Sequence, residues 1–436
     1  MNYYVNRNIL CIDLKSFFAS VECAKRGLDP FTTPLVVADI EKGEGTITLA
    51  VTPYLKKLGV PSRGRVYEIP YNIRKNIIFA KPRMNLYLKA SKEVIKIYLD
   101  YVSEEDMHVY SIDEVFLDVT DYLKLYNKTD YELALEIMNK IKEKTKITST
   151  CGIGPNLLLA KIALDIESKH NKNCIAKWTY KDVKTKLHNI TPLSKFWGIG
   201  KQYEKKLNNL GIEKIGDINK YPLSFYKKRF GVMGEELWYH ANGIDLSNIK
   251  KEKEKPKTKS LSNSQILYRD YTKEEIPLII SEMAELITKR LREKNFVCKM
   301  VGLGITYSKT IGGGFYHERK LDNYTDKTKT INEMCLNILN NYIKDLPIRK
   351  VSITLGKIKL KESEQLDIFN EYEINNLEHT IDEINDKFGG NTLLKASSLL
   401  DYSTIKSRNK KIGGHNKEWE KWLNGSRFTQ FLVKKK

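Results

Sequence analysis

Two acidic residues, Asp113 and Glu114, follow one another at the apex of an expected strand pair, in the stretch Ser-Ile-Asp-Glu at 111–114. The flanking stretches 106–110 and 115–119 alternate apolar and polar residues, which is typical of a β-hairpin. Neighbouring side chains on a strand face opposite ways, so both acids can serve one site only where the strand bends or ends. Adjacent carboxylates also repel unless a cation neutralises them. A solvated turn is the plain alternative, because acidic residues usually lie on the surface.

A third acid, Asp13, stands at the end of a hydrophobic strand expected over 9–14 and opens a helix expected over 15–22. A carboxylate in such a place is costly to bury unless it is used. It lies about a hundred residues before Asp113, yet closing a long loop costs only logarithmically more than closing a short one. Three carboxylates from two strands are the ligand set that a pair of Mg²⁺ ions requires, and two such ions clamp the oxygens of a phosphoryl transfer.

Both acidic stretches resemble the motifs of Y-family translesion DNA polymerases, the UmuC/DinB group. The motifs are Ile-Asp-Leu-Lys-Ser-Phe-Phe-Ala-Ser-Val-Glu at 12–22 and Ser-Ile-Asp-Glu at 111–114, and the resemblance extends over roughly the first 360 residues. It implies a template-directed, error-prone DNA polymerase that adds deoxynucleotides to a primer 3′ end with two Mg²⁺ ions. The family's metal ligands match Asp13, Asp113, Glu114 and the carbonyl oxygen of Leu14. Many members carry a second acid where Lys15 stands, a departure that leaves those ligands in place.

The resemblance implies a multidomain α+β fold, a right-hand polymerase with palm, fingers, helical thumb and little finger. In the last of these, strand and helix patterns alternate over 257–362 in the order β-α-β-β-α-β, which predicts a four-stranded sheet with two helices on one face. The other face is then free for the DNA backbone. The expected boundaries are 1–24 and 80–168 for the palm, 25–79 for the fingers, 169–249 for the thumb, 250–362 for an extended linker and little finger, and 363–436 for a clamp-binding motif and basic tail.

The same resemblance implies contacts to the incoming deoxynucleoside triphosphate. Phe17 and Phe18 end the first acidic motif, where the family places an aromatic ring under the sugar, and Phe18 is the expected steric gate. The segment 52–60 looks like the one in which a tyrosine and a basic residue hold the triphosphate, so Tyr54 and Lys56 are its candidates. A surface helix turn with ordinary lysines is the alternative interpretation of that segment.

Lys161 lies on a largely apolar helix that starts at residue 157. A buried lysine is expensive unless it meets an anion, and in the family a lysine at this place meets the triphosphate. A lysine that extends its amine to solvent is the alternative.

A helix-hairpin-helix pattern follows in the expected thumb, as Trp-Gly-Ile-Gly-Lys at 197–201 and Leu-Gly-Ile at 210–212. The glycines let the backbone turn tightly, and amides at a helix N-terminus can meet a DNA phosphate. Such contacts position DNA without reading its sequence. A helix that simply ends on glycine is the alternative. The expected DNA-binding residues are Gly198, Ile199, Gly200 and Lys201.

Beyond the last expected strand, the family often carries a short peptide that inserts Leu and Phe into a pocket of the sliding clamp. The matching residues are Gln365, Leu366, Ile368 and Phe369. Folding of this peptide back onto an amphipathic helix, expected over 374–388, is the alternative. For the basic stretch 391–436 a flexible tail, extra DNA contacts and a partner-binding segment all remain open.

The charge balance of 74 Lys+Arg against 54 Asp+Glu, a net +20, indicates a polyanionic partner. Primer-template DNA is favoured over an anionic membrane, since no apolar run approaches a spanning length. The N-terminus lacks a signal layout, and the six scattered cysteines form no C-x-x-C pair. We therefore expect reduced thiols in a cytoplasmic protein without membrane contact, acting as a monomer.

Two rival functions compete with this prediction. A different enzyme on a palm scaffold, such as a nucleotide cyclase, would need neither the helix-hairpin-helix pattern nor a net charge of +20. A catalytically silent DNA-bound scaffold that recruits repair partners would need no carboxylate triad. The sequence favours a polymerase over both.

Overall fold

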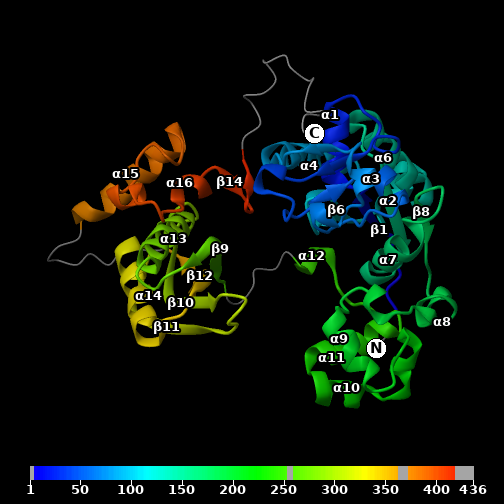
Figure 1. The fold of residues 1–436 in the computed structure, drawn as a ribbon. Helices are drawn as coiled ribbons and strands as arrows, with labels where there is room; N and C mark the ends of the chain where they lie inside the picture. The colour runs from blue at the N-terminus through cyan, green and yellow to red at the C-terminus, as the bar shows by residue number, and fades with distance from the viewer. Residues whose placement is uncertain (1–3, 253–258, 362–371, 418–436) are drawn as a thin grey trace. The chain divides into compact units, whose positions relative to one another are not determined.

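The computed structural model describes residues 4–252, 259–361 and 372–417. It divides into two compact units, residues 1–254 and 255–416, and each is described by itself (Figure 1). Three parts of the sequence prediction lie outside the described residues: the linker over 253–258, the clamp motif over 365–369 and the end of the tail from 418.

A five-stranded sheet forms the centre of the first unit, in the order β5-β6-β1-β7-β8. Its middle strand β1 pairs antiparallel with both β6 and β7, and β5 pairs antiparallel with β6. The strand expected over 9–14 and the hairpin expected over 106–119 are therefore confirmed. The strands are β1 (Ile9–Leu14), β5 (Met107–Val109), β6 (Glu114–Asp118), β7 (Ser149–Gly154) and β8 (Ile175–Lys177).

The alternation of side chains along β1 serves two different cores. Leu10, Ile12 and Leu14 belong to the large core with helices α4 (Met84–Leu99) and α6 (Asp130–Thr145), whereas Ile9 and Cys11 belong to a core with α7 (Leu157–Ala163). Asp13 lies two positions after Cys11 and four after Ile9, so its side chain lies on the same, α7 side of the sheet.

Helix α7 packs unusually close to β7. A Cβ built on Gly152 would stand 2.1 Å from the Ala160 carbonyl oxygen, and one on Gly154 would stand 2.4 Å from the Ala160 nitrogen. Both obstacles are backbone atoms that cannot rotate away, so glycine is required at both positions. The helix continues as a π-helical turn over Leu164–Ser168.

Smaller elements complete the first unit. A three-stranded sheet in the order β3-β2-β4 lies in the expected fingers, and short helices make up the expected thumb. The elements are α1 (Phe17–Lys25), β2 (Leu35–Val37), η1 (Ile40–Lys42), β3 (Ala50–Val51), α2 (Pro53–Lys57), η2 (Val66–Glu68), α3 (Tyr71–Arg74), β4 (Ile78–Ala80), η3 (Glu104–Asp106), α5 (Tyr122–Tyr126), α8 (Asp182–Thr185), η5 (Leu187–Asn189), η6 (Leu193–Lys195), α9 (Lys201–Asn208), η7 (Ile215–Lys220), α10 (Leu223–Phe230), α11 (Val232–Ala241) and α12 (Ile249–Glu252).

The prediction of an extended linker from residue 250 is wrong for its first residues, which form helix α12. Ile249 is buried beside Cys11 and Phe116, and the Lys250 amine lies 3.2 Å from Asp106 Oδ1. The buried Ile249 side chain and the ion pair of Lys250 thus stabilise a helical turn, whereas the run of lysines in the sequence indicated an extended chain.

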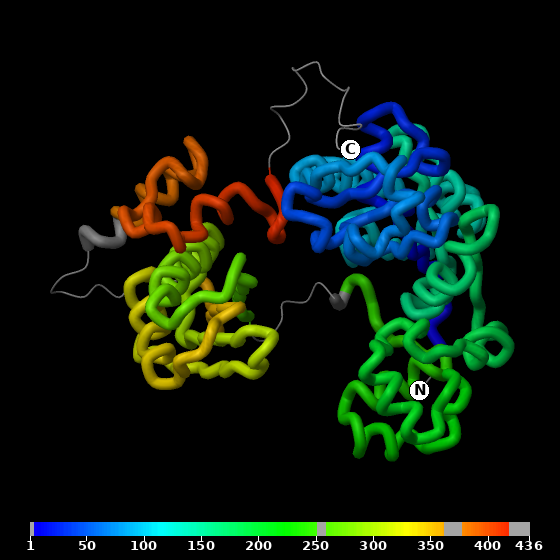
Figure 2. Tube along the Cα trace, in the orientation of Figure 1, coloured from blue at the N-terminus to red at the C-terminus, as the bar shows by residue number. Residues whose placement is uncertain are grey.

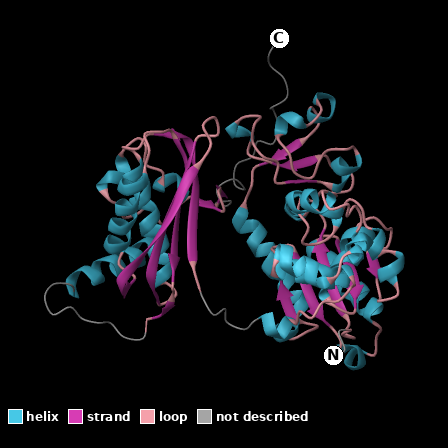
Figure 3. Ribbon diagram, turned by 90° about the horizontal axis from the view of Figure 1, so that it is seen from below, coloured by secondary structure: helices cyan, strands magenta, loops and turns pink. Residues whose placement is uncertain are grey.

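The second unit has the predicted element order, β9-α13-β10-β11-α14-β12. Its sheet order is β11-β10-β12-β9, and both helices share a core with one face of it, as the arrangement in Figure 3 shows. The bounds are β9 (Leu261–Tyr271), α13 (Ile276–Arg292), β10 (Phe296–Tyr307), β11 (Gly314–Thr325), α14 (Thr328–Tyr342), β12 (Ile348–Gly356) and β13 (Lys359–Leu360).

A C-terminal segment over 372–416 follows this sheet, and Figure 2 shows it in orange and red beside the green helix α13. The helix expected over 374–388 is present, but its contacts with α13 are largely ionic. Leu377 and Phe388 of the expected apolar stripe are 60% and 66% exposed. The segment contains α15 (Tyr372–Phe388), η8 (Ala396–Leu399), α16 (Ile405–Arg408), β14 (Lys411–Ile412) and β15 (His415–Asn416).

Two features bear on the environment of the protein. All six cysteines are free thiols, five of them buried, which agrees with the prediction of reduced cysteines. Across the described ranges, no helix combines the length and the apolar character that crossing a membrane demands.

Candidate active site

The three predicted carboxylates belong to neighbouring ends of β1 and β6. The strand register sets Asp13 directly opposite Glu114. Asp113 comes just before β6, and its carbonyl oxygen accepts a hydrogen bond of 2.9 Å from the Leu14 amide. The strand thus begins at Glu114, which frees Asp113 from strict alternation. The Ser111 hydroxyl donates to Asp113 Oδ1 at 2.6 Å and holds that side chain in the turn.

Two lysines pair with these acids. The Lys161 amine lies 2.7 Å from Glu114 Oε1, and the Lys169 amine lies 3.2 Å from Asp13 Oδ2. Asp165 lies between the lysines, 3.0 Å from Lys161 and 2.8 Å from Lys169. Sequence reasoning found Lys161 but missed Lys169. The four-residue spacing of Lys161, Asp165 and Lys169, which places them on one helical face, was the signal available.

The acids disturb one another electrostatically. Burial raises the pKa of Asp13 to about 6, with Asp113 and Glu114 adding to the rise and Lys169 opposing it. Burial alone would lower the pKa of Lys161, but Cys11, Glu114 and Asp165 outweigh it and hold that pKa above its usual value. Mutual repulsion among oxygen ligands is the condition that a hard divalent cation relieves, so the chemistry of these donors suits such an ion. Glu114 and Asp13 are instead paired with Lys161 and Lys169, and in the described ranges no three His, Cys, Asp or Glu side chains are gathered into a metal-holding group.

The expected sugar gate, Phe18, rests on a rigid support. Its ring stacks on Tyr87 with centroids 4.5 Å apart and planes inclined by 21°. The Tyr87 hydroxyl donates to Glu22 Oε1 at 2.8 Å, and Glu22 is fully buried against Arg83 and Arg26. Phe17, by contrast, is buried in the core, so only its backbone is available to a nucleotide.

The expected triphosphate segment forms helix α2. Burial lowers the pKa of Lys56; Asp13 opposes this change, while Lys169 and Lys15 add to it. Lys56 is therefore an electrostatic neighbour of the carboxylates. Tyr54 packs against the core of the three-stranded sheet beside Val36 and Leu55.

The helix-hairpin-helix turn has the backbone geometry that its sequence indicated. Gly198 has φ +89°, and Gly200 is the N-cap of α9, which starts at Lys201. A Cβ built on either glycine would meet nothing within 4 Å, so open space lies beside both positions, while Ile199 is buried. Trp197 ties this turn to the acidic hairpin, because its indole N–H donates to the Tyr110 hydroxyl at 3.2 Å.

Comparison with known proteins agrees with this geometry. The impB/mucB/samB family model matches residues 12–165, its helix-hairpin-helix motif matches 180–212, and its C-terminal domain matches 258–368. The "Putative UV-damage repair protein UvrX" of Bacillus subtilis (strain 168) is 40% identical over 94% of this chain and 98% of its own length. "DNA polymerase IV 2" of the same organism is 31% identical over the same shares.

A solved structure of a Y-family DNA polymerase chimera of Dbh and Dpo4 has a TM-score of 0.64 to this chain. It is 23% identical and covers 81% of this chain and 99% of its own, which supports the right-hand α+β fold. Together the three matched family models and the two relatives of nearly full length leave one assignment: the chain belongs to the impB/mucB/samB family of Y-family DNA polymerases.

Proposed function

We propose that the protein is a DNA-directed DNA polymerase that copies damaged templates by adding deoxynucleotides to a primer 3′ end. The observation that carries the proposal is the register of β1 and β6, which sets Asp13 opposite Glu114 beside the Asp113 turn. Lys161 and Lys169, within ion-pair distance of these acids, supply the positive charge that a triphosphate needs.

Asp13, Asp113, Glu114 and the Leu14 carbonyl oxygen would hold two divalent ions, with Mg²⁺ the natural choice for a set of carboxylates and phosphates. When bound, such ions neutralise the charge on the reacting phosphate and lower the free-energy cost of deprotonating the attacking 3′-hydroxyl. The amines of Lys161 and Lys169 are then no longer needed by Glu114 and Asp13, and with Lys56 they would bind the triphosphate. Tyr54 is the further candidate on α2, and Phe18 would lie under the sugar.

DNA would bind through backbone contacts in both units. In the first, the amides around Gly198 and Gly200, with Lys201, would meet a phosphate. In the second, the sheet face without helices would meet the DNA backbone: Gly302 and Gly304 of β10 lie there opposite Thr354 and Ser352 of β12, with Tyr316 of β11 packed beside them. The net charge of +20 favours such contacts with phosphate.

Primer extension tests the proposal directly. We expect the full chain to extend a primer on a defined template with Mg²⁺ and all four deoxynucleotides, and to pass an abasic site that stops a replicative polymerase. Chelation of the metal should stop extension while leaving primer-template binding intact. Binding without extension under any divalent cation would instead favour the catalytically silent scaffold.

We further propose a cytoplasmic monomer that binds a sliding clamp through Gln365, Leu366, Ile368 and Phe369. Phosphate contacts alone hold DNA weakly at physiological salt, and tethering to a ring raises the local concentration of DNA. Leu366→Ala/Phe369→Ala should leave unassisted extension and thermal stability unchanged but abolish stimulation by the host's clamp. A lower melting temperature with stimulation intact would support the fold-back of the peptide onto α15 instead.

A further inference from the structure

The C-terminal segment over 372–416 is bound along one face of α13, outside the stretches that the family models match. Its partners on α13 recur at spacings of three and four residues, which define a single helical face. The segment runs antiparallel to the helix, so its C-terminal residues contact the N-terminal part of α13. The pairs are Glu282 with Ser403 and Thr404, Glu285 with Lys395, Lys289 with Asp386, and Arg292 with Asp382 and Glu378.

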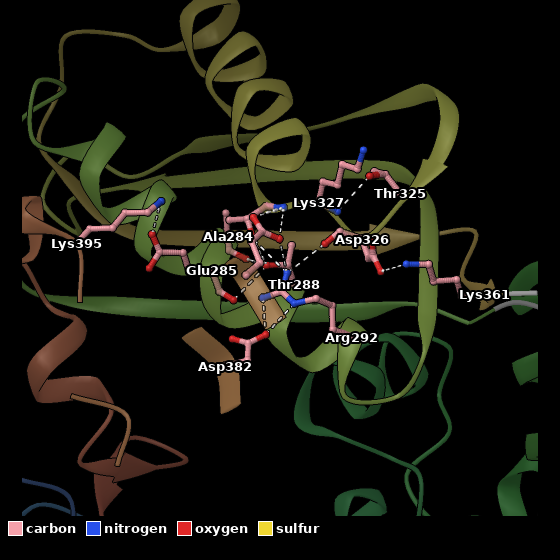
Figure 4. A network of polar contacts seen from close by, with 12 residues as sticks. Ala284, Glu285, Thr288, Arg292, Thr325, Asp326, Lys327, Lys361, Asp382 and Lys395 are labelled. Carbon is pink, nitrogen blue, oxygen red and sulfur yellow. Dashed lines mark hydrogen bonds and ion pairs between the residues drawn. The ribbon is translucent and has the colours of Figure 1, made fainter. Parts of the chain in front are cut away.

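The contacts at the two ends of this face are made by buried or half-buried groups, whereas Asp386 and Lys395 in the middle are exposed. Glu282 is 2% exposed and accepts 3.0 Å and 2.9 Å hydrogen bonds from the amide and hydroxyl of Thr404. Figure 4 shows Lys395 pointing to Glu285 and Arg292 pointing to Asp382. The closest nitrogen and oxygen atoms are 2.7 Å apart in each pair. Buried charges with several partners fix position more firmly than exposed pairs do. The segment is therefore an integral part of the second unit.

The end of the segment passes around the edge strand β9. On the helix side, Arg408 donates to Gln265 Oε1 at 2.6 Å. Further along the strand, the Lys411 amine lies 2.7 Å from the Tyr268 hydroxyl and 4.6 Å from the centre of that ring. Gln265 is buried, whereas Tyr268 is exposed in the part of β9 where the pairing with β12 is irregular. The segment thus brings Lys411 to the exposed edge of the sheet.

Three cations on this stretch have no acidic partner among the described residues. Lys406 and Lys410 are exposed, and neither they nor Lys411 forms an ion pair with any residue in the described ranges. The neighbouring part of the sheet carries a further positive charge, since Lys350 of β12 lies opposite Ile266 of β9 on the helix-free face. Cations without acidic partners that gather along a strand edge are suited to a row of phosphates.

We propose that Lys406, Lys410 and Lys411 extend the DNA-binding surface of the second unit around the edge of β9, where they contact phosphates of the duplex. The inference rests on the proposed function only in taking the helix-free face as the one that meets DNA. A segment that served merely as a brace for α13 would need the ion pairs along that helix, but not these three lysines. The three lysines lie at the strand edge, beyond the residues that pair with α13, and this placement indicates a polyanionic partner.

The test compares two triple variants of the full chain. Lys406→Gln/Lys410→Gln/Lys411→Gln removes the three cations. The matched control, Lys294→Gln/Lys329→Gln/Lys344→Gln, removes three exposed lysines on and beside the helices that cover the other face. Binding of a blunt DNA duplex is measured over a range of salt concentrations, because each phosphate contact contributes about 0.9 to the slope of log affinity against log salt.

The first variant should lose about 2–3 from that slope and bind duplex at least tenfold more weakly at 0.1 M salt, with the control close to wild type. An unchanged slope, or an equal loss in both variants, would overturn the inference, as would a loss seen only with single-stranded DNA. Primer extension by the control separates this result from the proposed function. If the control binds duplex but extends no primer under any divalent cation, the polymerase proposal fails while the slope still decides the role of the lysines.

Discussion

Asp13→Asn is expected to abolish primer extension and, at the same time, to make the metal-free protein more stable. Asparagine keeps the size of the side chain but removes the charge that would hold a divalent ion. Metal stabilisation of a phosphoryl transition state contributes several kcal/mol, so incorporation should fall about 10³-fold or more. Affinity for primer-template should change less than twofold, because phosphate contacts elsewhere supply it.

The gain in stability follows from the pKa of about 6 that burial and the neighbouring acids give Asp13. This value lies above the unfolded one, so the folded protein binds the proton more tightly than the unfolded chain does. The stabilisation from that proton is complete below about pH 4 and is lost as the pH rises through 6. At neutral pH the charged carboxylate therefore costs roughly 3 kcal/mol, which asparagine removes.

Thermal melts in the presence of a chelator measure this effect. Asp13→Asn should melt several degrees above wild type at pH 7.5, and the difference should shrink as the pH is lowered toward 4. The exposed Asp121→Asn is the matched control and should melt with wild type throughout. If Asp13→Asn melts below wild type at pH 7.5, the charged Asp13 carboxylate stabilises the fold and the expectation is wrong.

Phe18→Ala is expected to raise the use of ribonucleotides relative to deoxynucleotides by about a hundredfold. A ring under the sugar leaves no room for a 2′-hydroxyl, and exclusion by such a clash is worth about 2–3 kcal/mol. The stack on Tyr87 holds the ring in place, so the gate has little freedom to move aside. The measured quantity is the ratio of incorporation efficiencies for one base with each sugar.

Tyr87→Phe serves as the control for that experiment. It keeps the stacked ring and removes only the hydroxyl that donates to Glu22. Its sugar ratio should stay much nearer to wild type than that of Phe18→Ala. If Phe18→Ala leaves the ratio unchanged while lowering thermal stability, Phe18 belongs to the core and the gate lies elsewhere.

The acidic site could be predicted from the sequence because each step depended on local pattern. Alternation predicted β1 and the hairpin, and the requirement that Asp113 lie outside a regular strand is met by a strand that begins at Glu114. The element order of the second unit followed from the same kind of pattern.

The contacts that sequence reasoning missed all depend on partners far apart in the chain. Nothing near Lys169 indicates that its amine meets Asp13, 156 positions earlier, and nothing near Arg292 indicates Glu378 or Asp382. The apolar stripe of α15 suggested a packing face, but the helix is held by its acidic side. Helical spacing could place Lys169 on the same face as Lys161, but local pattern could not identify partners this far apart in the chain.

Because α7 packs closely on β7, Gly152 and Gly154 determine how near the charged amine of Lys161 lies to the acidic site. A methyl group on Gly152 or Gly154 would collide with the backbone at Ala160 and push the helix outward. Lys161, the next residue along that helix, would move with it and away from Glu114. Inherited changes at these glycines would therefore look, in a screen for lost activity, like damage to the catalytic centre, although neither residue bears a group that could act on a substrate.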